Sequence, residues 1–399
     1  MKTLNLFVIL LTIIVTNKVA LADKPLKIFI LAGQSNMQGH ASVETFKHIG
    51  MDKKTAPLLK EILDSQGKPK VCDRVWISYL HGMKSGEKDH EKNGKLTTGF
   101  GAQNGNKIGP EFGFGITMEK LTDHPILIIK TAWGGKSMHT DFRSPAGGEF
   151  KFNESDLDMH RKKGRDVKKI IAEKNEATGL YYRTMLTHVK NILQDIKRVY
   201  PDYDPKIGYE IAGFVWFQGW NDMVDRGVYP NRDKAGGYDT YSEILSHFIR
   251  DIRKELAAPK IPFVIGVMGV GGILDLKNPN RYTPIHNNFR KAMAAPAETP
   301  EFKDNVKVVL TENYWDKELS ELDSRWGKVK QKSKELAKNK EITAKERKAA
   351  LNQFISETYT KEELEIKKAG ISNFGFHYLG SAKILVQIGK AFAEALEEE

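Results

Sequence analysis

Five short, continuous apolar runs constrain the fold of this chain more than any other feature. They lie at 26–33, 126–130, 210–217, 263–268 and 306–310, and longer polar or amphipathic segments separate them. A continuous apolar run, unlike an alternating one, is typical of a strand that is buried on both faces. Because such runs alternate with helical segments, we expect a central parallel sheet of about five strands with helices on both sides, an α/β fold.

The segments between these runs differ in character. Amphipathic spacing predicts helices over 113–121, 180–200, 238–256 and 381–396. Residues 40–105 and 136–178 are polar and weakly periodic, so we interpret them as long surface loops. The lysine-rich stretch 317–368 contains two capping-box sequences, which begin at Thr343 and Thr360. We interpret that stretch as a helical insertion in one domain that spans 23–399.

The N-terminus resembles an export signal. Lys2 is followed by an apolar core over 4–15 and then by Ala20-Leu21-Ala22, a small-x-small cleavage pattern. The apolar core is too short to span a bilayer comfortably, which disfavours the alternative of a retained anchor. We therefore expect residues 1–22 to be a signal peptide, cleaved after Ala22, with export to the periplasm or the extracellular space and no spanning segment afterwards.

The charge distribution and the single cysteine limit the partners and the chemistry. The formal net charge is +11, and residues 324–348 alone hold ten Lys/Arg against three Glu. An excess concentrated in one stretch is typical of a solvated helical face, so we expect no nucleic-acid partner. Cys72 has no second cysteine to pair with, and no histidine lies close to it in sequence, so we interpret it as structural. The oligomeric state is left open by these features.

Several cofactor classes lack sequence support. There is no phosphate-binding loop and no cluster at metal-ligand spacing, and the glycines at 269–272 do not form a dinucleotide fingerprint. The nucleophile elbow of α/β-hydrolases is absent too, because Met37 stands where its last glycine would be. We expect no metal and no cofactor.

Chemistry-bearing residues follow three of the predicted strands directly. In a doubly wound sheet the C-terminal strand ends lie together, so we expect these loops to meet. Ser35 is then placed to attack a carbonyl, and backbone N–H groups with a side-chain amide are placed to stabilise the oxyanion. The three loops are Gly33-Gln34-Ser35, Trp133-Gly134-Gly135 and Gln218-Gly219-Trp220-Asn221-Asp222.

A serine nucleophile needs a base, and histidine is the usual one. His377 lies in a loop just before the last predicted helix, at the expected sheet edge. His40 and His139 also lie near that edge and are rival candidates. Sequence position alone does not decide between the three.

Four blocks of the chain resemble a known family in the same order. Gly33-Gln34-Ser35-Asn36-Met37 is similar to the signature of the sialate O-acetylesterase-like group of SGNH hydrolases, which includes carbohydrate esterase family 6. The later blocks are Ile108-Gly-Pro-Glu111, Trp133-Gly-Gly135 and Trp216-Phe-Gln-Gly219. The resemblance covers most of 26–272 and then the loop around His377.

The resemblance implies a flavodoxin-like three-layer α/β/α sandwich and ester hydrolysis without a metal. It also implies that Ser35 is the nucleophile and His377 the base. The implied oxyanion donors are Ser35, Gly134, Gly135 and Asn221.

Two positions depart from the family pattern. Trp220 stands where many members have glutamate, and Phe374 stands where an aspartate usually precedes the histidine by three residues. The group that orients His377 is therefore unassigned. Asp222, Asn373 and Asp316 are possible substitutes, and a Ser–His dyad held by a backbone carbonyl is another.

These features predict an exported carboxylester hydrolase that removes acetyl groups from carbohydrate. A non-catalytic carbohydrate-binding protein on the same fold and an esterase for non-sugar esters are the alternatives. The acetylated carbohydrate is the expected partner, and Arg143 is a candidate to meet a carboxylate or sulfate on it. The full set of expected substrate-binding residues is Gln34, Trp133, His139, Arg143, Gln218 and Trp220.

Overall fold

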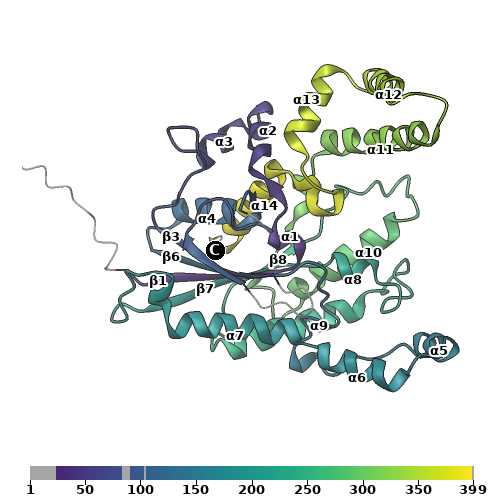
Figure 1. Ribbon diagram of the computed structural model, residues 1–399. Helices are drawn as coiled ribbons and strands as arrows, with labels where there is room; N and C mark the ends of the chain where they lie inside the picture. The colour runs from purple at the N-terminus through teal and green to yellow at the C-terminus, as the bar shows by residue number, and fades with distance from the viewer. Residues whose placement is uncertain (1–23, 83–89, 103–104, 398–399) are drawn as a thin grey trace, which may run out of the picture.

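A seven-stranded sheet forms the centre of the molecule in the computed structural model, which describes residues 24–82, 90–102 and 105–397 (Figure 1). The expected signal peptide, 1–22, lies outside the described residues. The strand order is β4-β3-β6-β1-β7-β8-β9, and β1 (Leu26–Gly33) is the central strand. The other strands are β3 (Val75–His81), β4 (His90–Lys95), β6 (Ile126–Ala132), β7 (Tyr209–Phe217), β8 (Phe263–Val267) and β9 (Val306–Leu310).

Helices cover both faces of the sheet, as the apolar runs predict. On one face, α4 (Pro110–Leu121) packs against α14 (Ala382–Glu397). On the other lie α7 (Leu180–Gln194) and α9 (Asp239–Glu255) (Figure 1). Strands β1, β6 and β7 are almost wholly buried at their C-terminal halves. The predicted three-layer α/β/α sandwich with a parallel centre is confirmed.

The interpretation of 40–105 as surface loops is wrong. This stretch contains α2 (Phe46–Met51), α3 (Ala56–Ile62), β3 and β4. β3 runs parallel to β6, whereas β4 pairs with β3 in the antiparallel sense and forms the edge of the sheet. β4 is polar and exposed, so it lacks the apolar run that marks a central strand. β3, in contrast, is a continuous and buried apolar run, and the loop interpretation overlooked it. With β3 and β4 the sheet has seven strands instead of about five.

Two further segments add helices outside the sandwich. Residues 136–178, expected to be a loop, contain α5 (Glu154–Lys162) and α6 (Val167–Ala177), which project below the sheet in Figure 1. Residues 317–370 form α11 (Lys317–Lys338), α12 (Ala344–Thr358) and α13 (Lys361–Gly370). Both predicted capping boxes are formed, at the starts of α12 and α13.

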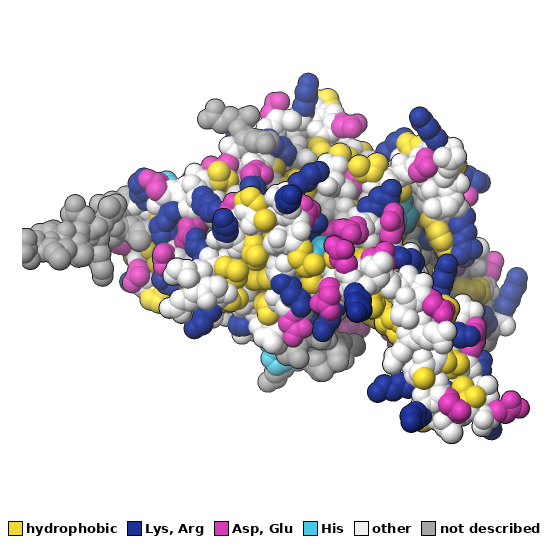
Figure 2. Space-filling model, turned by 90° about the horizontal axis from the view of Figure 1, so that it is seen from above, with side chains coloured by type: hydrophobic (Ala, Val, Ile, Leu, Met, Phe, Trp, Pro, Cys, Tyr) yellow, Lys and Arg dark blue, Asp and Glu magenta, His cyan; other side chains and the backbone are white. Residues whose placement is uncertain are grey.

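Charges of both signs are interspersed on the face that carries this insertion, where Lys and Arg alternate with Asp and Glu (Figure 2). That distribution fits the expected solvated helical surface. Among the described residues, no helix is long and apolar enough to cross a bilayer.

Candidate active site

Three strand-end loops meet at the C-terminal edge of the sheet. Gly33, the last residue of β1, pairs in register with Ala132 of β6 and with Phe217 of β7. A Cβ at Gly33 would lie 2.1 Å from the carbonyl oxygen of Phe217, so a side chain has no room at this position. The glycine therefore lets β1 approach β7 closely enough for the loops that follow to share one site.

A cavity of about 610 Å³ opens between these loops. It brings together Ser35, Gly134, Gly135, Asn221 and His377, which are the predicted nucleophile, oxyanion donors and base. Residues that the sequence did not single out also line it: Gln38, His81, Gly82, His90 and Phe376. Within the described ranges, no group of three or more His, Cys, Asp or Glu side chains is placed to hold a metal ion.

Ser35 begins the short helix α1 (Ser35–Gln38) and is 8% exposed. The backbone N–H groups of Ser35 and Gly134 donate no hydrogen bond to the described part of the chain, which leaves both available to a ligand oxygen. A Cβ built on Gly134 would lie 3.9 Å from the Cβ of Ser35 and 3.2 Å from Oε1 of Gln38. Gly134 thus lies close to the serine, which an oxyanion donor requires.

Gln34 and Gln218, expected to bind substrate, are buried and bridge the loops instead. Oε1 of Gln34 accepts hydrogen bonds from Nε2 of Gln218 and from the N–H of Gly219, both at 3.3 Å. Nε2 of Gln218 also donates to the carbonyl of Lys136 at 3.0 Å. Neither glutamine lines the cavity, so the structure places them as supports of the site.

Asp222 fixes the loop that follows β6. Its carboxylate accepts from the N–H groups of Met138, at 2.8 Å, and His139, at 3.0 Å, and from Nε2 of Gln218, at 2.6 Å. Burial raises the pKa of Asp222, and these donors offset part of that effect. Tyr229 donates to the same carboxylate at 3.4 Å, and His377 is not among its partners in the described chain. Asp222 therefore holds the loop that carries Gly134 and does not orient His377.

Asn373 is the group that contacts the predicted base, His377. Nδ1 of His377 lies 2.8 Å from Oδ1 of Asn373. The same Oδ1 accepts the N–H of Phe374 at 2.8 Å, which fixes the orientation of the amide. Because an acceptor oxygen faces Nδ1, that nitrogen carries the proton and Nε2 keeps its lone pair. Of the three candidate orienting residues, the structure places Asn373 beside the histidine.

The ring of His377 is held by stacking as well. His40 stacks on it with ring centroids 3.9 Å apart and an angle of 3° between the planes. Phe376 also packs edge-on against this ring, with centroids 4.4 Å apart. Burial lowers the pKa of His377 to about 4 and that of His40 to about 3, with nearby positive charge adding to each effect. Both rings are therefore neutral near pH 7.

The two tryptophans have different surroundings. Trp220 is half-buried, lines the cavity and packs against Phe376, with centroids 5.6 Å apart. Trp133 also borders the cavity but is only 1% exposed, and its ring packs against Tyr181 and Phe142. Trp220 is the tryptophan whose ring is accessible to a ligand.

Three other candidates are not among the residues that line this cavity. His139 is buried and bonds to Asp225 through Nε2 at 3.1 Å. Arg143 donates to the backbone carbonyls of His139, Gly147 and Gly148, so its guanidinium already has partners. Asp316 caps α11 and pairs with Lys383 at 2.9 Å.

A buried ion pair beneath the cavity escaped sequence-based prediction. Nζ of Lys130 lies 2.7 Å from Oε2 of Glu111, and both side chains are fully buried. Lys130 also donates to the carbonyl of Phe100 at 2.7 Å and to that of Gln38 at 2.9 Å. Gln38 is the last residue of α1. The pair therefore anchors the short helix that begins with Ser35. A lysine inside an apolar strand was the available signal, because lysine is almost never buried unpaired.

Comparison with known proteins identifies related sequences. A family model described as "Carbohydrate esterase, sialic acid-specific acetylesterase" matches residues 25–319. That range includes Ser35, Gly134 and Asn221 but ends before His377. No curated protein matches the chain.

Solved structures that resemble the chain are distant. One is a protein from Arabidopsis thaliana (16% identity, TM-score 0.36, covering 72% of this chain and 86% of that one). Another is a carbohydrate acetylesterase from Xanthomonas citri (14% identity, TM-score 0.39, covering 73% and 51%). A third is NanS (13% identity, TM-score 0.34, covering 72% and 78%).

Proposed function

The chain belongs to the sialic acid-specific acetylesterase family of carbohydrate esterases and is a carboxylic ester hydrolase, and we propose that it removes O-acetyl groups from carbohydrate through an acetyl-enzyme on Ser35. One observation carries this proposal. A single cavity is lined by Ser35, by the neutral, oriented His377 and by the candidate oxyanion donors Gly134 and Asn221.

In the first half of the reaction, Oγ of Ser35 attacks the acetyl carbonyl carbon, and Nε2 of His377 takes the hydroxyl proton. The carbonyl oxygen becomes an oxyanion, which accepts hydrogen bonds from the N–H groups of Ser35 and of Gly134 or Gly135 and from the side-chain amide of Asn221. The imidazolium then protonates the sugar oxygen, and the C–O bond breaks. Acetyl-Ser35 and the free sugar hydroxyl result.

In the second half, a water molecule replaces the sugar. Nε2 of His377 takes one of its protons while the oxygen attacks the acetyl carbon, and the same donors hold the second oxyanion. Return of the proton to Oγ of Ser35 releases acetate. Asn373 keeps the proton on Nδ1 throughout, so Nε2 alone exchanges protons with the substrate.

The proposed triad is Ser35, His377 and Asn373. The third member is an amide and not a carboxylate, which affects the pKa of the histidine. An amide oxygen orients imidazole without the full negative charge of a carboxylate, as in enzymes that use a Cys-His-Asn arrangement. Burial therefore lowers the pKa of His377 to about 4, and the positive charge of Lys107 adds to this effect. A base with so low a pKa stays neutral in mildly acidic solution, so we expect activity to persist well below pH 6.

The alternative of a non-catalytic binding protein rests on the missing aspartate at position 374. Asn373, one residue earlier, supplies the hydrogen bond that the aspartate would make.

The half-buried Trp220 at the cavity wall favours a sugar over a plain alkyl ester, because an aromatic ring packs against the apolar face of a pyranose.

The protein is also proposed to act after export. The charged start, the apolar core and Ala20-Leu21-Ala22 support cleavage after Ala22. Expression with residues 1–22 intact, followed by N-terminal sequencing of the exported protein, tests this step. A mature chain that starts at Asp23 is expected, and retention of Met1 in the exported protein would contradict it.

Hydrolysis of p-nitrophenyl acetate by the wild type and by Ser35→Ala tests the catalytic proposal. Ser324→Ala is the matched control, because Ser324 is exposed on α11. We expect Ser35→Ala to lose activity and Ser324→Ala to keep it. Acetate release from acetylated xylan, O-acetylated sialic acid and acetylated algal polysaccharide, measured side by side, then identifies the sugar. Release from none of them would contradict the carbohydrate assignment.

A further inference from the structure

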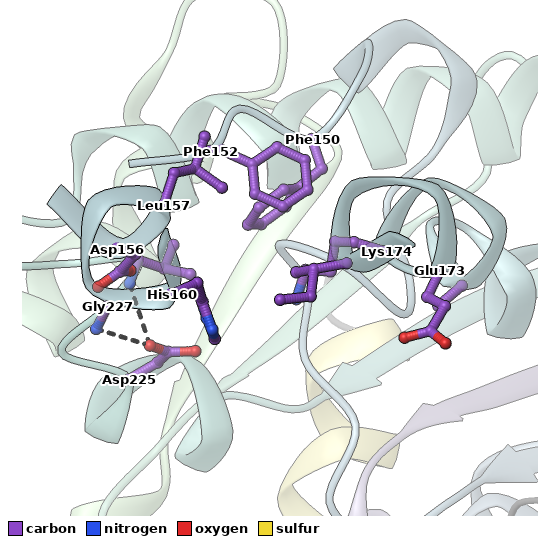
Figure 3. Close-up of a pocket in the computed structure, with 12 residues that line it drawn as sticks. Phe150, Phe152, Asp156, Leu157, His160, Glu173, Lys174, Asp225 and Gly227 are labelled. Carbon is purple, nitrogen blue, oxygen red and sulfur yellow. Dashed lines mark hydrogen bonds between the residues drawn. The ribbon is translucent and has the colours of Figure 1, made fainter. Parts of the chain in front are cut away.

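A second cavity, of about 410 Å³, lies between α5, α6 and the loop that follows α8 (Trp220–Val224). Figure 3 shows its lining residues, none of which lines the catalytic cavity. Both helices belong to the segment 136–178, which is not part of the sandwich. The volume of this cavity falls in the range that is typical of small-molecule binding sites.

Aromatic rings form one wall. Phe150 and Phe152 are half-buried, and their rings meet edge to face, with centroids 5.0 Å apart and an angle of 83°. Leu157 of α5 continues this wall in Figure 3. Partly exposed aromatic rings in a cavity give a ligand a flat apolar surface to pack against.

Polar groups with fixed positions lie on the other sides. The carboxylate of Asp225 accepts from the N–H groups of Gly227, at 2.9 Å, and Val228, at 3.0 Å, and contacts His139 at 3.1 Å. These bonds hold it in one orientation before any ligand arrives. Asp156 lies on the same side, and Lys174 extends from α6 toward Phe150, with its Nζ 4.4 Å from the ring centroid.

The mixture of charges narrows the class of ligand. The carboxylates of Asp156, Asp225 and Glu173 and the ammonium group of Lys174 line the cavity together, and Glu173 is also paired with Lys169 at 3.9 Å. A strong anion would be repelled by the carboxylates, and a strong cation would be repelled by Lys174. A neutral ligand with several hydroxyl groups is repelled by neither the carboxylates nor the lysine, because hydroxyls donate to carboxylates and accept from an ammonium group. An apolar face on the same ligand would cover the two phenylalanine rings.

We propose that this cavity is an accessory binding site for a neutral pyranose unit of a polysaccharide, separate from the catalytic cavity. The apolar face of the sugar packs on Phe150 and Phe152, and its hydroxyls bond to Asp156, Asp225 and Lys174. The site adjoins the loop of the oxyanion donors, because His139 contacts both Asp225 and Asp222. It thereby holds the polymer against the same region of the enzyme that hydrolyses its ester.

Calorimetric titration of the Ser35→Ala protein with xylohexaose, cellohexaose and mannohexaose tests the proposal. The Ser35→Ala background removes turnover, so the result does not depend on the proposed esterase chemistry. At least one neutral hexasaccharide should bind, and Phe152→Ala and Asp156→Ala should each weaken that binding by about tenfold or more. Phe152→Tyr, which keeps the ring, should stay within about twofold.

Asp158→Ala is the matched control for Asp156→Ala. Asp158 lies two residues further along α5, is exposed and pairs with Arg161. Circular dichroism and the thermal midpoint establish that each variant is folded. The proposal is overturned if no neutral hexasaccharide binds, or if Phe152→Ala binds as tightly as its parent. Tighter binding of trigalacturonic acid than of every neutral sugar would overturn the neutral class.

Discussion

Asn373 is the residue whose replacement tests the orientation of the base most sharply. Its Oδ1 lies 2.8 Å from Nδ1 of His377, and the N–H of Phe374 fixes the amide. Asn373→Ala removes the acceptor and leaves His377 with stacking contacts alone. The ring can then rotate or change tautomer, and the imidazolium that forms during attack loses a hydrogen bond.

The size of the effect follows from the charge on that imidazolium. A hydrogen bond to a charged group contributes about 1.5–3 kcal/mol, and each 1.4 kcal/mol is about tenfold in rate. Asn373 is half-buried, so we expect the lower part of this range. For p-nitrophenyl acetate, kcat/KM should fall by about 10- to 30-fold in Asn373→Ala.

Asn373→Asp keeps the acceptor and adds a charge, which makes it the matched control. A carboxylate beside the ring favours the imidazolium, so it should raise the pKa of His377 from about 4 toward its usual value of about 6.5. The base acts only when it is neutral. The wild type should therefore lose kcat/KM as the pH falls through about 4, and Asn373→Asp should lose it at a higher pH.

We would measure kcat/KM of the wild type and both variants between pH 4 and 9 and check folding by circular dichroism. Two outcomes would show that Asn373 does not orient His377. One is a wild-type kcat/KM in Asn373→Ala. The other is a pH profile of Asn373→Asp that superimposes on that of the wild type.

Three further predictions concern the surroundings of the serine. Asn221→Ala removes an oxyanion donor, so kcat should fall by about 10²- to 10³-fold, and an unchanged kcat on p-nitrophenyl acetate would exclude that role. His377→Ala should lower kcat by about 10³-fold or more, whereas His40→Ala should cost under about tenfold; the reverse order in the same assay would make His40 the base. Glu111→Gln leaves Lys130 buried without its counter-charge, so urea denaturation should show a loss of about 3–5 kcal/mol in the free energy of unfolding, and a loss below about 1 kcal/mol would contradict this.

Most strands of the sheet were predictable, because a buried strand is marked by a run of apolar residues in its own sequence. β1, β6, β7, β8 and β9 are continuous apolar runs, and each was recognised within a few residues of its observed bounds. β3 was missed although its run is apolar and buried, because it is short and lies within an otherwise polar segment. β4 was missed because an exposed edge strand of charged and polar residues carries no such run. Its pairing with β3 depends on a partner that no local pattern reveals.

For the candidate site, the positions of the loops were predictable, whereas the roles of several side chains were not. The glycine-rich loops after β1, β6 and β7 were expected to meet because parallel strands end at one edge. The roles of individual side chains depended on contacts between distant segments. Asp222 is in the correct loop but bonds to the backbone of 138–139, and Gln34 and Gln218 bond to each other instead of lining the cavity. Asn373 was one of three candidates, and a distance was needed to choose it.

Covalent labelling tests the central claim, that Ser35 is the nucleophile, most directly. The wild type is treated with a fluorophosphonate, digested and mapped by mass spectrometry, with Ser35→Ala treated in parallel. We expect one adduct, on the peptide that contains Ser35, formed as esterase activity is lost, and no adduct in Ser35→Ala. An adduct on another residue that accompanies the loss of activity, or full activity in Ser35→Ala, would contradict it.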